Sequence, residues 1–353
     1  MSTSPSAAAG VTVLICTYNG AARLPEMLRH VAAQQVPAHV PWEVLIISNA
    51  SKDDTLAVAE KLGCALALPV PFRVLDEPHP GKEHALVQGF AAAAYEFVAV
   101  VDDDNWLAPD YVRRAYEVLS AHPEIGVLGA HAEGAFEVPP PAWFPEFQAV
   151  YAVGPQNGGK SGPLPAREGY LYGACSVVRQ SGWRKLLTHG FTFTTSAKRG
   201  KVLSGAEDVE LGDALRLAGY VLWYDEHLRF RHFMFKERLT WQYLLRMARG
   251  TASSQLTSVV YYFIFRHPEL SESRFRQLYA KRLLWLASQI ARQPGNLVNA
   301  LLRPNLEELT SNFETMRLLY NFKVSIAQRE DAVAVFRQVR ALQQRLAEAG
   351  STA

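Results

Sequence analysis

Three consecutive carboxylates, Asp102-Asp103-Asp104, are the residues of this chain with the clearest capacity for chemistry. They follow the run 97–101, which is apolar on both faces and is typical of a central strand in a covered sheet. Crowded like charges favour a nearby cation, and open α/β sheets bind ligands at the carboxyl ends of their strands. We therefore predict a divalent metal site for an anionic ligand. The alternative is a solvated turn before a helix, in which Pro109 suits an early position.

A second acidic pair, Glu207-Asp208, precedes a helical pattern that includes Leu211. Ser204 and Glu207 fit a capping box, which is a sufficient structural role for Glu207. Asp208 lies three residues before Leu211 and is expected to face the buried side, where a carboxylate needs a partner or a function. Asp208 is therefore either an acid that the helix dipole favours or a general base that accepts a proton from a hydroxyl group.

A third candidate is His232, in the alternating segment 228–234. Strand alternation puts its side chain on the same face as three apolar residues, whereas Arg229 and Arg231 point the other way. The inward residues are Leu228, Phe230, His232 and Met234. His232 is then either a hydrogen-bonded core residue or an imidazole ligand of the predicted metal.

The elements that must position these residues alternate between strands and helices. Strands are predicted over 11–16, 42–47, 72–75 and 97–101, and helices over 21–35, 53–62, 81–94 and 109–120. Ser51 suits the N-cap of the second of these helices. Such alternation predicts an α/β fold with a doubly wound, mainly parallel sheet.

Polar residues follow each of the four predicted strands. They are Thr17-Tyr18-Asn19-Gly20, Ser48-Asn49-Ala50-Ser51, Asp76-Glu77 and the three aspartates. Any one of these groups could be only a turn or a cap, but parallel strands would bring all four to one edge of the sheet. This convergence favours a ligand site. A dinucleotide is an unlikely ligand, because no GxGxxG motif follows the first strand.

Composition and patterning predict three regions within the 353 residues: a disordered N-terminus over 1–9, an α/β domain over 10–236, and a helical C-terminal extension over 237–353. A long, flexible loop is expected at about 134–168, and its aromatic residues argue against simple disorder. The net charge of +2 gives no reason to expect nucleic acid as a partner. Three scattered cysteines indicate a reducing compartment, and residues 250–265 are too polar for a membrane span.

Taken together, these motifs resemble the family 2 glycosyltransferases of the GT-A fold over residues 10 to 235. The resemblance rests on order and spacing, and covers Thr17-Tyr18-Asn19-Gly20, Asn49-Ala50-Ser51-Lys52-Asp53-Asp54-Thr55, Asp102-Asp103-Asp104, Gly173-Ala174, Glu207-Asp208 and Leu217-Ala218-Gly219-Tyr220. It implies transfer of a sugar, with inversion, from a nucleotide-diphosphate donor to a carbohydrate or lipid-linked acceptor. It also implies a Mg²⁺ or Mn²⁺ ion, which would offset the charge of the diphosphate leaving group. The family resemblance implies as well that the domain over 10–236 is catalytic and that the loop at about 134–168 contacts the acceptor.

The resemblance also implies roles for individual residues. Asp104 would bind the metal directly, Asp102 would hold the ribose or a metal-bound water, and His232 would complete the metal shell. Asp208 would take the proton of the acceptor. Residues implied to contact the nucleotide or substrate are Thr17, Tyr18, Asn19, Ser48, Asn49, Lys82, Asp102, Asp103 and Glu207.

The sequence departs from the family pattern at two places. Ser48 stands where the family often has an aspartate that reads uracil, so GDP and dTDP donors stay open beside UDP. Leu86-Val87 stand where the family often has Arg-Asn, and we expect Lys82 or His84 to replace those contacts.

Two other classes of protein compete with this reading. A sugar-nucleotide nucleotidyltransferase should carry a Gly-rich, basic phosphate loop after the first strand, and residues 17–22 lack it. A non-catalytic binding protein of the same fold would have no need of Asp104 and Asp208. The basic C-terminal helices are expected to pack on the catalytic domain or on a second subunit, or to touch an anionic membrane from the cytoplasmic side.

Overall fold

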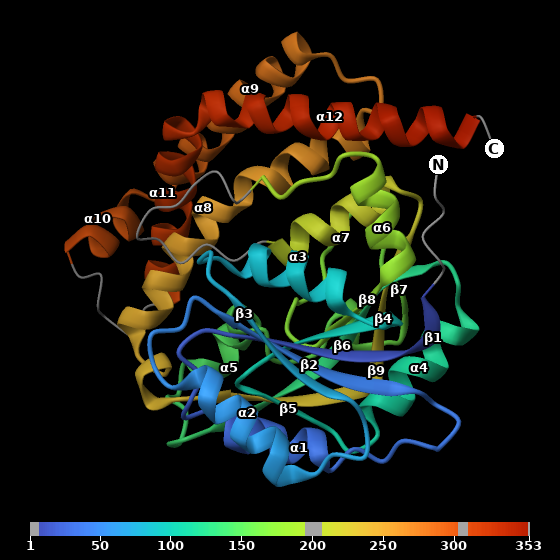
Figure 1. Ribbon diagram of the computed structural model, residues 1–353. Coiled ribbons are helices and arrows are strands. Elements are labelled where there is room, and N and C mark those ends of the chain that lie inside the picture. The colour runs from blue at the N-terminus through green and yellow to red at the C-terminus, as the bar shows by residue number, and fades with distance from the viewer. Residues whose placement is uncertain (1–6, 195–206, 303–309, 352–353) are drawn as a thin grey trace. The chain divides into compact units, whose positions relative to one another are not determined.

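A computed structural model describes residues 7–194, 207–302 and 310–351 (Figure 1). The chain divides into two compact units. The first comprises Met1–Ala135, Ala152–Phe191 and Ala214–Met234, and the second comprises Phe136–Tyr151, Thr192–Asp213 and Phe235–Ala353. The predicted motifs therefore fall in both units: the three aspartates and His232 belong to the first, whereas Glu207 and Asp208 belong to the second.

The first unit is built on a nine-stranded mixed sheet of order β3-β2-β1-β4-β8-β6-β9-β5, with β7 paired to β9. The strands are β1 (Ala8–Thr17), β2 (Trp42–Asn49), β3 (Phe72–Glu77), β4 (Tyr95–Asp102), β5 (Asn105–Leu107), β6 (Ile125–Phe136), β7 (Gly162–Pro163), β8 (Ser176–Arg179) and β9 (Val221–Met234). β3, β2, β1 and β4 run parallel, whereas β8 is antiparallel to β4. The four predicted strands are present, and β1 already begins at Ala8, inside the segment expected to be disordered.

Helices cover both faces of this sheet (Figure 1). They are α1 (Leu24–Ala32), α2 (Thr55–Leu66), α3 (Lys82–Ala92), α4 (Tyr111–Ala121) and α6 (Gln180–Thr188). One core joins buried residues of α1 and α4 to the side chains of β1, β2 and β4 that face them, such as Ile15 and Val101. On the other face α3 approaches β1 closely at Gly89. A Cβ atom at this position would lie only 2.5 Å from the Leu14 side chain. Phe90 of α3 stacks on Trp183 of α6.

The cap predicted for α2 is wrong. Asp54 precedes this helix without a capping side-chain bond, and the Ser51 hydroxyl accepts a hydrogen bond from the Asn19 backbone N–H instead. Ser51 lies three residues before Asp54 and is used to join two turns. A serine before a helical pattern is thus a weak signal when a neighbouring loop offers an alternative donor.

The second unit is mainly helical. It contains α5 (Phe144–Phe147), α8 (Trp241–Arg266), α9 (Glu272–Ala291), α10 (Pro294–Leu302), α11 (Thr310–Ala327) and α12 (Arg329–Ser351), and α7 (Glu207–Leu217) begins in it. Thr240 and Ser271 cap α8 and α9 with their hydroxyl groups. Within the described ranges no helix is long and apolar enough to cross a membrane.

The segment expected as a loop at about 134–168 is more structured than predicted. Trp143 and Phe147 pack edge-on against Trp241 of α8, and Phe147 also contacts Phe313 of α11. Helix α5, two 3₁₀ turns and β7 lie in this segment. Burial of several large aromatic side chains supplies the free energy that a long irregular loop would lack.

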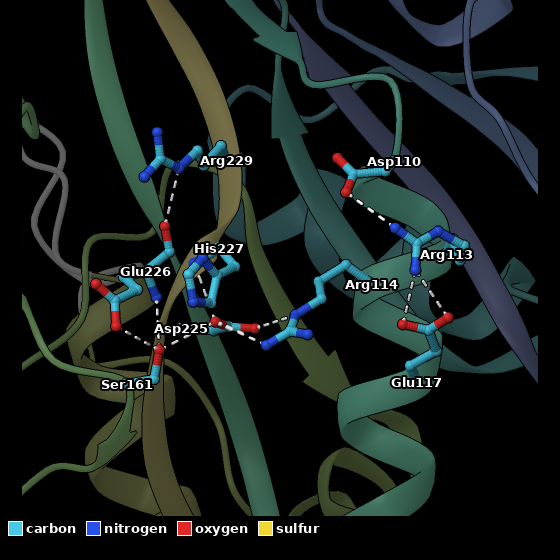
Figure 2. A network of polar contacts seen from close by, with 9 residues as sticks. All are labelled: Asp110, Arg113, Arg114, Glu117, Ser161, Asp225, Glu226, His227 and Arg229. Atoms are coloured by element: carbon cyan, nitrogen blue, oxygen red, sulfur yellow. Dashed lines mark hydrogen bonds and ion pairs between the residues drawn. The ribbon is translucent and has the colours of Figure 1, made fainter.

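A buried carboxylate ties α4 to β9 in the first unit. Asp225 accepts hydrogen bonds from Arg114 of α4 at 2.6 and 3.2 Å, from the Ser161 hydroxyl at 3.1 Å and from the His227 backbone N–H at 3.0 Å (Figure 2). Burial alone would raise the pKa of Asp225, but these donors outweigh it and lower the pKa below its usual value. The bonds hold the strand that carries His232.

Arg114→Met should destabilise the protein by about 3 kcal/mol, because it leaves the Asp225 carboxylate buried without its cation. Arg113→Met is the matched control, since Arg113 is on the same helix but pairs with the more exposed Asp110 and Glu117 (Figure 2). The control should cost at most about 1 kcal/mol. Urea unfolding of both variants measures the difference, and equal losses would contradict the role assigned to Asp225.

Candidate active site

The carboxyl ends of the parallel strands meet at one edge of the sheet, as the sequence predicts. In the strand register Thr17 lies beside Ser48, Cys16 beside Asp102, and Asn49 beside Glu77. The polar groups after β1, β2, β3 and β4 therefore converge. This is the edge at which open α/β sheets bind their ligands.

The middle aspartate points into the protein. Asp103 is 6% exposed and forms a two-point ion pair with Arg23, with N–O distances of 2.6 and 2.8 Å. The Thr17 hydroxyl donates a third hydrogen bond to the same carboxylate. Burial raises the pKa of Asp103, and Arg23 and Thr17 offset part of that rise. Thr17 and Asp103, both expected to contact the nucleotide, are thus joined to each other.

Gly20 is required by this arrangement. A Cβ at Gly20 would lie 2.5 Å from the Asp103 carboxylate and closer still to the Thr17 hydroxyl. Real Cβ atoms do not approach oxygen so closely, and neither the buried carboxylate nor the hydroxyl has room to withdraw. The glycine of the motif after β1 therefore makes space for the ion pair.

Asp102 and Lys82 form a second, more accessible pair. The Lys82 ammonium lies 2.5 Å from an Asp102 carboxylate oxygen, and each side chain is 32% exposed. Lys82 begins α3 directly after Gly81, whose φ of +135° favours glycine. The structure thus brings together two residues that the sequence singled out separately, and it leaves a cation next to the strand end.

Asp104 lies beside His232. Asn105 pairs with His232 across β5 and β9, and the Phe233 backbone N–H donates to the Asp104 carbonyl at 2.8 Å. As a result the His232 Nε2 lies 3.7 Å from an Asp104 carboxylate oxygen, with the two side chains 13% and 7% exposed. His232 faces inward, as the strand alternation predicts.

The pair Asp104 and His232 offers one carboxylate oxygen and one imidazole nitrogen, donors that suit Mn²⁺ and are compatible with Mg²⁺. Among the described residues, no group of three or more His, Cys, Asp or Glu is arranged to hold a metal ion. Asp102, predicted as a further ligand, is in contact with Lys82.

Asn19 and Asn49, both predicted to contact the nucleotide, form hydrogen bonds that connect neighbouring turns. The Asn19 side chain accepts from the Lys52 N–H at 2.8 Å, which ties the turn after β1 to the turn after β2. The Asn49 side chain donates to the His79 carbonyl at 2.7 Å and accepts from the Gly81 N–H at 2.9 Å. These bonds hold three neighbouring turns in fixed positions, and Lys82 follows directly on the last of them.

Ser48 and Tyr18 differ in accessibility. Ser48 is 1% exposed, and within the described part of the chain its hydroxyl has no hydrogen-bond partner. Such an unsatisfied group at a ligand edge is unusual and has spare capacity to bind one. Tyr18 is 53% exposed, so its ring is accessible to a ligand.

Glu207 and Asp208 begin α7 in the second unit. Glu207 is buried, whereas Asp208 is half-buried and accepts a hydrogen bond from the Val209 backbone N–H at 2.8 Å. The predicted capping partner Ser204 lies outside the described residues. The first turn of α7 contains three acidic residues, Glu207, Asp208 and Glu210, and the N-terminus of a helix favours such negative charges.

Two contributors were missed by the sequence analysis. Arg23 is 80 residues from Asp103 in the chain, and nothing in the local pattern marks it as a partner. Cys175 lies behind the aspartates, where burial, Asp102 and Asp104 together raise the pKa of its thiol well above the usual value. The thiol is therefore neutral, and its role is packing. The Tyr111 hydroxyl donates a hydrogen bond to the backbone carbonyl of Cys175 at 2.5 Å.

Comparison with known proteins defines the class. Residues 12–181 match the model of the family described as glycosyl transferase family 2. The mannosyltransferase PcManGT from Pyrobaculum calidifontis, solved with GDP-Man and Mn²⁺, has a similar fold, with a TM-score of 0.52, 18% identity and coverage of 97% of this chain and 86% of that one. Residues 12–181, slightly less than half of the chain, thus resemble glycosyl transferase family 2, and the chain has the GT-A fold.

Curated relatives match over part of their length. The poly(ribitol-phosphate) beta-N-acetylglucosaminyltransferase TarS of Staphylococcus aureus is 29% identical over 111 residues, which are 31% of this chain and 19% of the relative. The undecaprenyl-phosphate 4-deoxy-4-formamido-L-arabinose transferase of Sodalis glossinidius is 27% identical over 118 residues, or 33% and 36% of the two chains. The chain thus spans between a fifth and about a third of these relatives.

Arg23→Met should cost about 3 kcal/mol of stability at pH 7.5, because the Asp103 carboxylate loses its cation. Without Arg23 the pKa of Asp103 would rise further above its unfolded value of about 3.9, so the cost is present above that raised pKa and shrinks as the pH falls through it. Urea unfolding at pH 7.5 and pH 4.5 measures this. A loss that does not depend on pH, or one that Asp103→Asn fails to relieve in the double variant, would contradict the assignment.

Proposed function

We propose that this protein is a metal-dependent inverting glycosyltransferase that moves a sugar from a nucleotide-diphosphate donor to an acceptor hydroxyl. The observation that carries the proposal is the convergence of Asp102, Asp104 and His232 at the carboxyl edge of the sheet. The two aspartates lie in the segment that matches family 2, and His232 lies beyond it. The match supports nucleotide-sugar chemistry, and the carboxylates and imidazole supply the groups that this chemistry needs.

Asp104 and His232 would hold the Mg²⁺ or Mn²⁺ ion, since together they offer one oxygen and one nitrogen donor. When bound, the ion would offset the negative charge that develops on the departing diphosphate. Lys82 adds a positive charge at the same edge, and its contact holds Asp102 in place for the ribose or a metal-bound water. Lys82 would thereby replace the basic contact that Leu86-Val87 cannot provide.

The nucleoside would lie over the turns after β1 and β2. Tyr18 has an exposed ring that could stack on the base, and the buried Ser48 hydroxyl has unused hydrogen-bonding capacity beside it. Thr17, Asn19, Asn49 and Asp103 would act by shaping these turns through the bonds described above. A serine can both donate and accept, so UDP, GDP and dTDP donors all remain compatible with this site.

Asp208, supported by Glu207, would accept the proton of the acceptor hydroxyl while the new bond forms at the anomeric carbon. Asp208 is half-buried at the start of α7, where the N-terminus of a helix favours negative charge. The acceptor would be a carbohydrate or a lipid-linked molecule, reached from the cytoplasm or at the inner face of the membrane. The names of two relatives include poly(ribitol-phosphate) and undecaprenyl-phosphate, a polymer and a lipid phosphate, and so support this range.

Nucleotide sugars should raise the melting temperature when Mn²⁺ or Mg²⁺ is present. At a ligand concentration of about 100 times Kd, a stabilisation near 2.7 kcal/mol is expected, or roughly 5 °C for a chain of this size. Asp104→Ala and His232→Ala should abolish the metal-dependent part of the shift, whereas the surface variant Glu133→Ala should keep it. No response to UDP, GDP or dTDP sugars with either metal would refute the proposed function.

Asp208→Asn should slow hydrolysis of the responsive donor, in which water replaces the acceptor, by about 10²- to 10⁴-fold. Donor-induced stabilisation should not change, since the base acts only on the attacking hydroxyl. Asp110→Asn, which changes an exposed carboxylate in the first unit, is the control and should hydrolyse the donor at the normal rate. Full activity in Asp208→Asn would remove this residue as the base.

A further inference from the structure

Large apolar side chains are exposed on two consecutive helices of the second unit. On α9 the exposed fraction is 72% for Leu284 and 55% for Trp285. On α10 it is 53% for Val298, 61% for Leu301 and 76% for Leu302. Single exposed apolar residues are ordinary, but five on adjoining helices are the usual sign of an interaction surface.

The spacing of these residues puts them on one face of each helix. Leu284 and Trp285 follow Lys281 by three and four residues, and Arg292 follows Leu284 by eight, so all four lie along one side of α9. Val298, Leu301 and Leu302 have the same i, i+3, i+4 spacing on α10. Only Arg292 and Gln293 separate the two helices. Lys281 and Arg292 are both exposed, one on each side of the apolar pair of α9.

Basic residues predominate on these two helices. After Glu272, which begins α9 and pairs with Arg276, residues 273–302 contain five Lys and Arg residues and no Asp or Glu. A second copy of the chain would be a poor partner, because an isologous interface would bring the same basic residues face to face. A surface that is anionic and also accepts apolar side chains would satisfy both features at once.

We propose that the α9–α10 surface, which consists of these five apolar residues with Lys281 and Arg292, binds an anionic membrane peripherally. The apolar side chains would enter the boundary between headgroups and acyl chains, with Trp285 at the headgroup level. Lys281 and Arg292 would remain at the anionic headgroups. The proposal concerns where the protein acts and does not depend on sugar transfer, since vesicles without any donor or acceptor are sufficient to test it.

Vesicle flotation of the full chain tests the proposal, with phosphatidylcholine vesicles and with vesicles that contain about 30% phosphatidylglycerol. The protein should float with the anionic vesicles, and high salt should release it because charge contributes to binding. Lys281→Gln with Arg292→Gln should weaken the partitioning roughly 25-fold, or about fivefold for each basic residue. Trp285→Ser with Leu302→Asn should abolish it at low salt, where the parent protein binds.

Leu187→Asn is the matched control, because Leu187 is 44% exposed in the first unit and should not affect binding. Circular dichroism shows whether each variant is folded, and the charge variant keeps the test valid if the apolar variant unfolds. Failure of the parent protein to bind anionic vesicles would overturn the proposal. So would a dimer in sedimentation velocity that the Trp285 and Leu302 changes dissociate, since the surface would then bind a second copy.

Discussion

The candidate site depends on one buried ion pair, between Asp103 and Arg23. The carboxylate is desolvated and would be unfavourable alone, but the guanidinium and the Thr17 hydroxyl compensate it. The pair joins the turn after β4 to the turn after β1. Because Asp103 is held by Arg23, its two neighbours on the same turn are held as well: Asp102 contacts Lys82, and the buried Asp104 faces His232.

The turns around this ion pair are fastened to one another by side-chain amides and not by packing alone. Asn19 and Asn49 each bond to the backbone of a neighbouring turn, so three turns form one rigid rim. A rim of this kind fixes its groups before a ligand arrives, which lowers the entropy lost on binding. A motif residue that resembles a ligand contact can therefore have a different role, which is to hold neighbouring residues in position.

Local patterns predicted much of this structure, and non-local contacts account for what they missed. The apolar runs of β1, β2 and β4 and the alternation that turns His232 inward are visible in short windows of sequence. The partners of Asp102 and Asp103 lie 20 and 80 residues away, and no periodicity reveals them. Ser51 was misassigned as a helix cap because its hydroxyl bonds to another loop. The aromatic segment around Trp143 was expected to be irregular because its packing partners follow much later in the chain.

The reversal of strand direction between β4 and β8 has a consequence for how such a protein can diversify. The first 102 residues contain β1 to β4, which make up the parallel half of the sheet, and the chain returns antiparallel to it only at Ser176. The sequence between the end of α4 at Ala121 and Ser176 can therefore lengthen or be exchanged without breaking a parallel strand pair. Related proteins could therefore differ in this later sequence and still keep the parallel strands β1 to β4 unchanged.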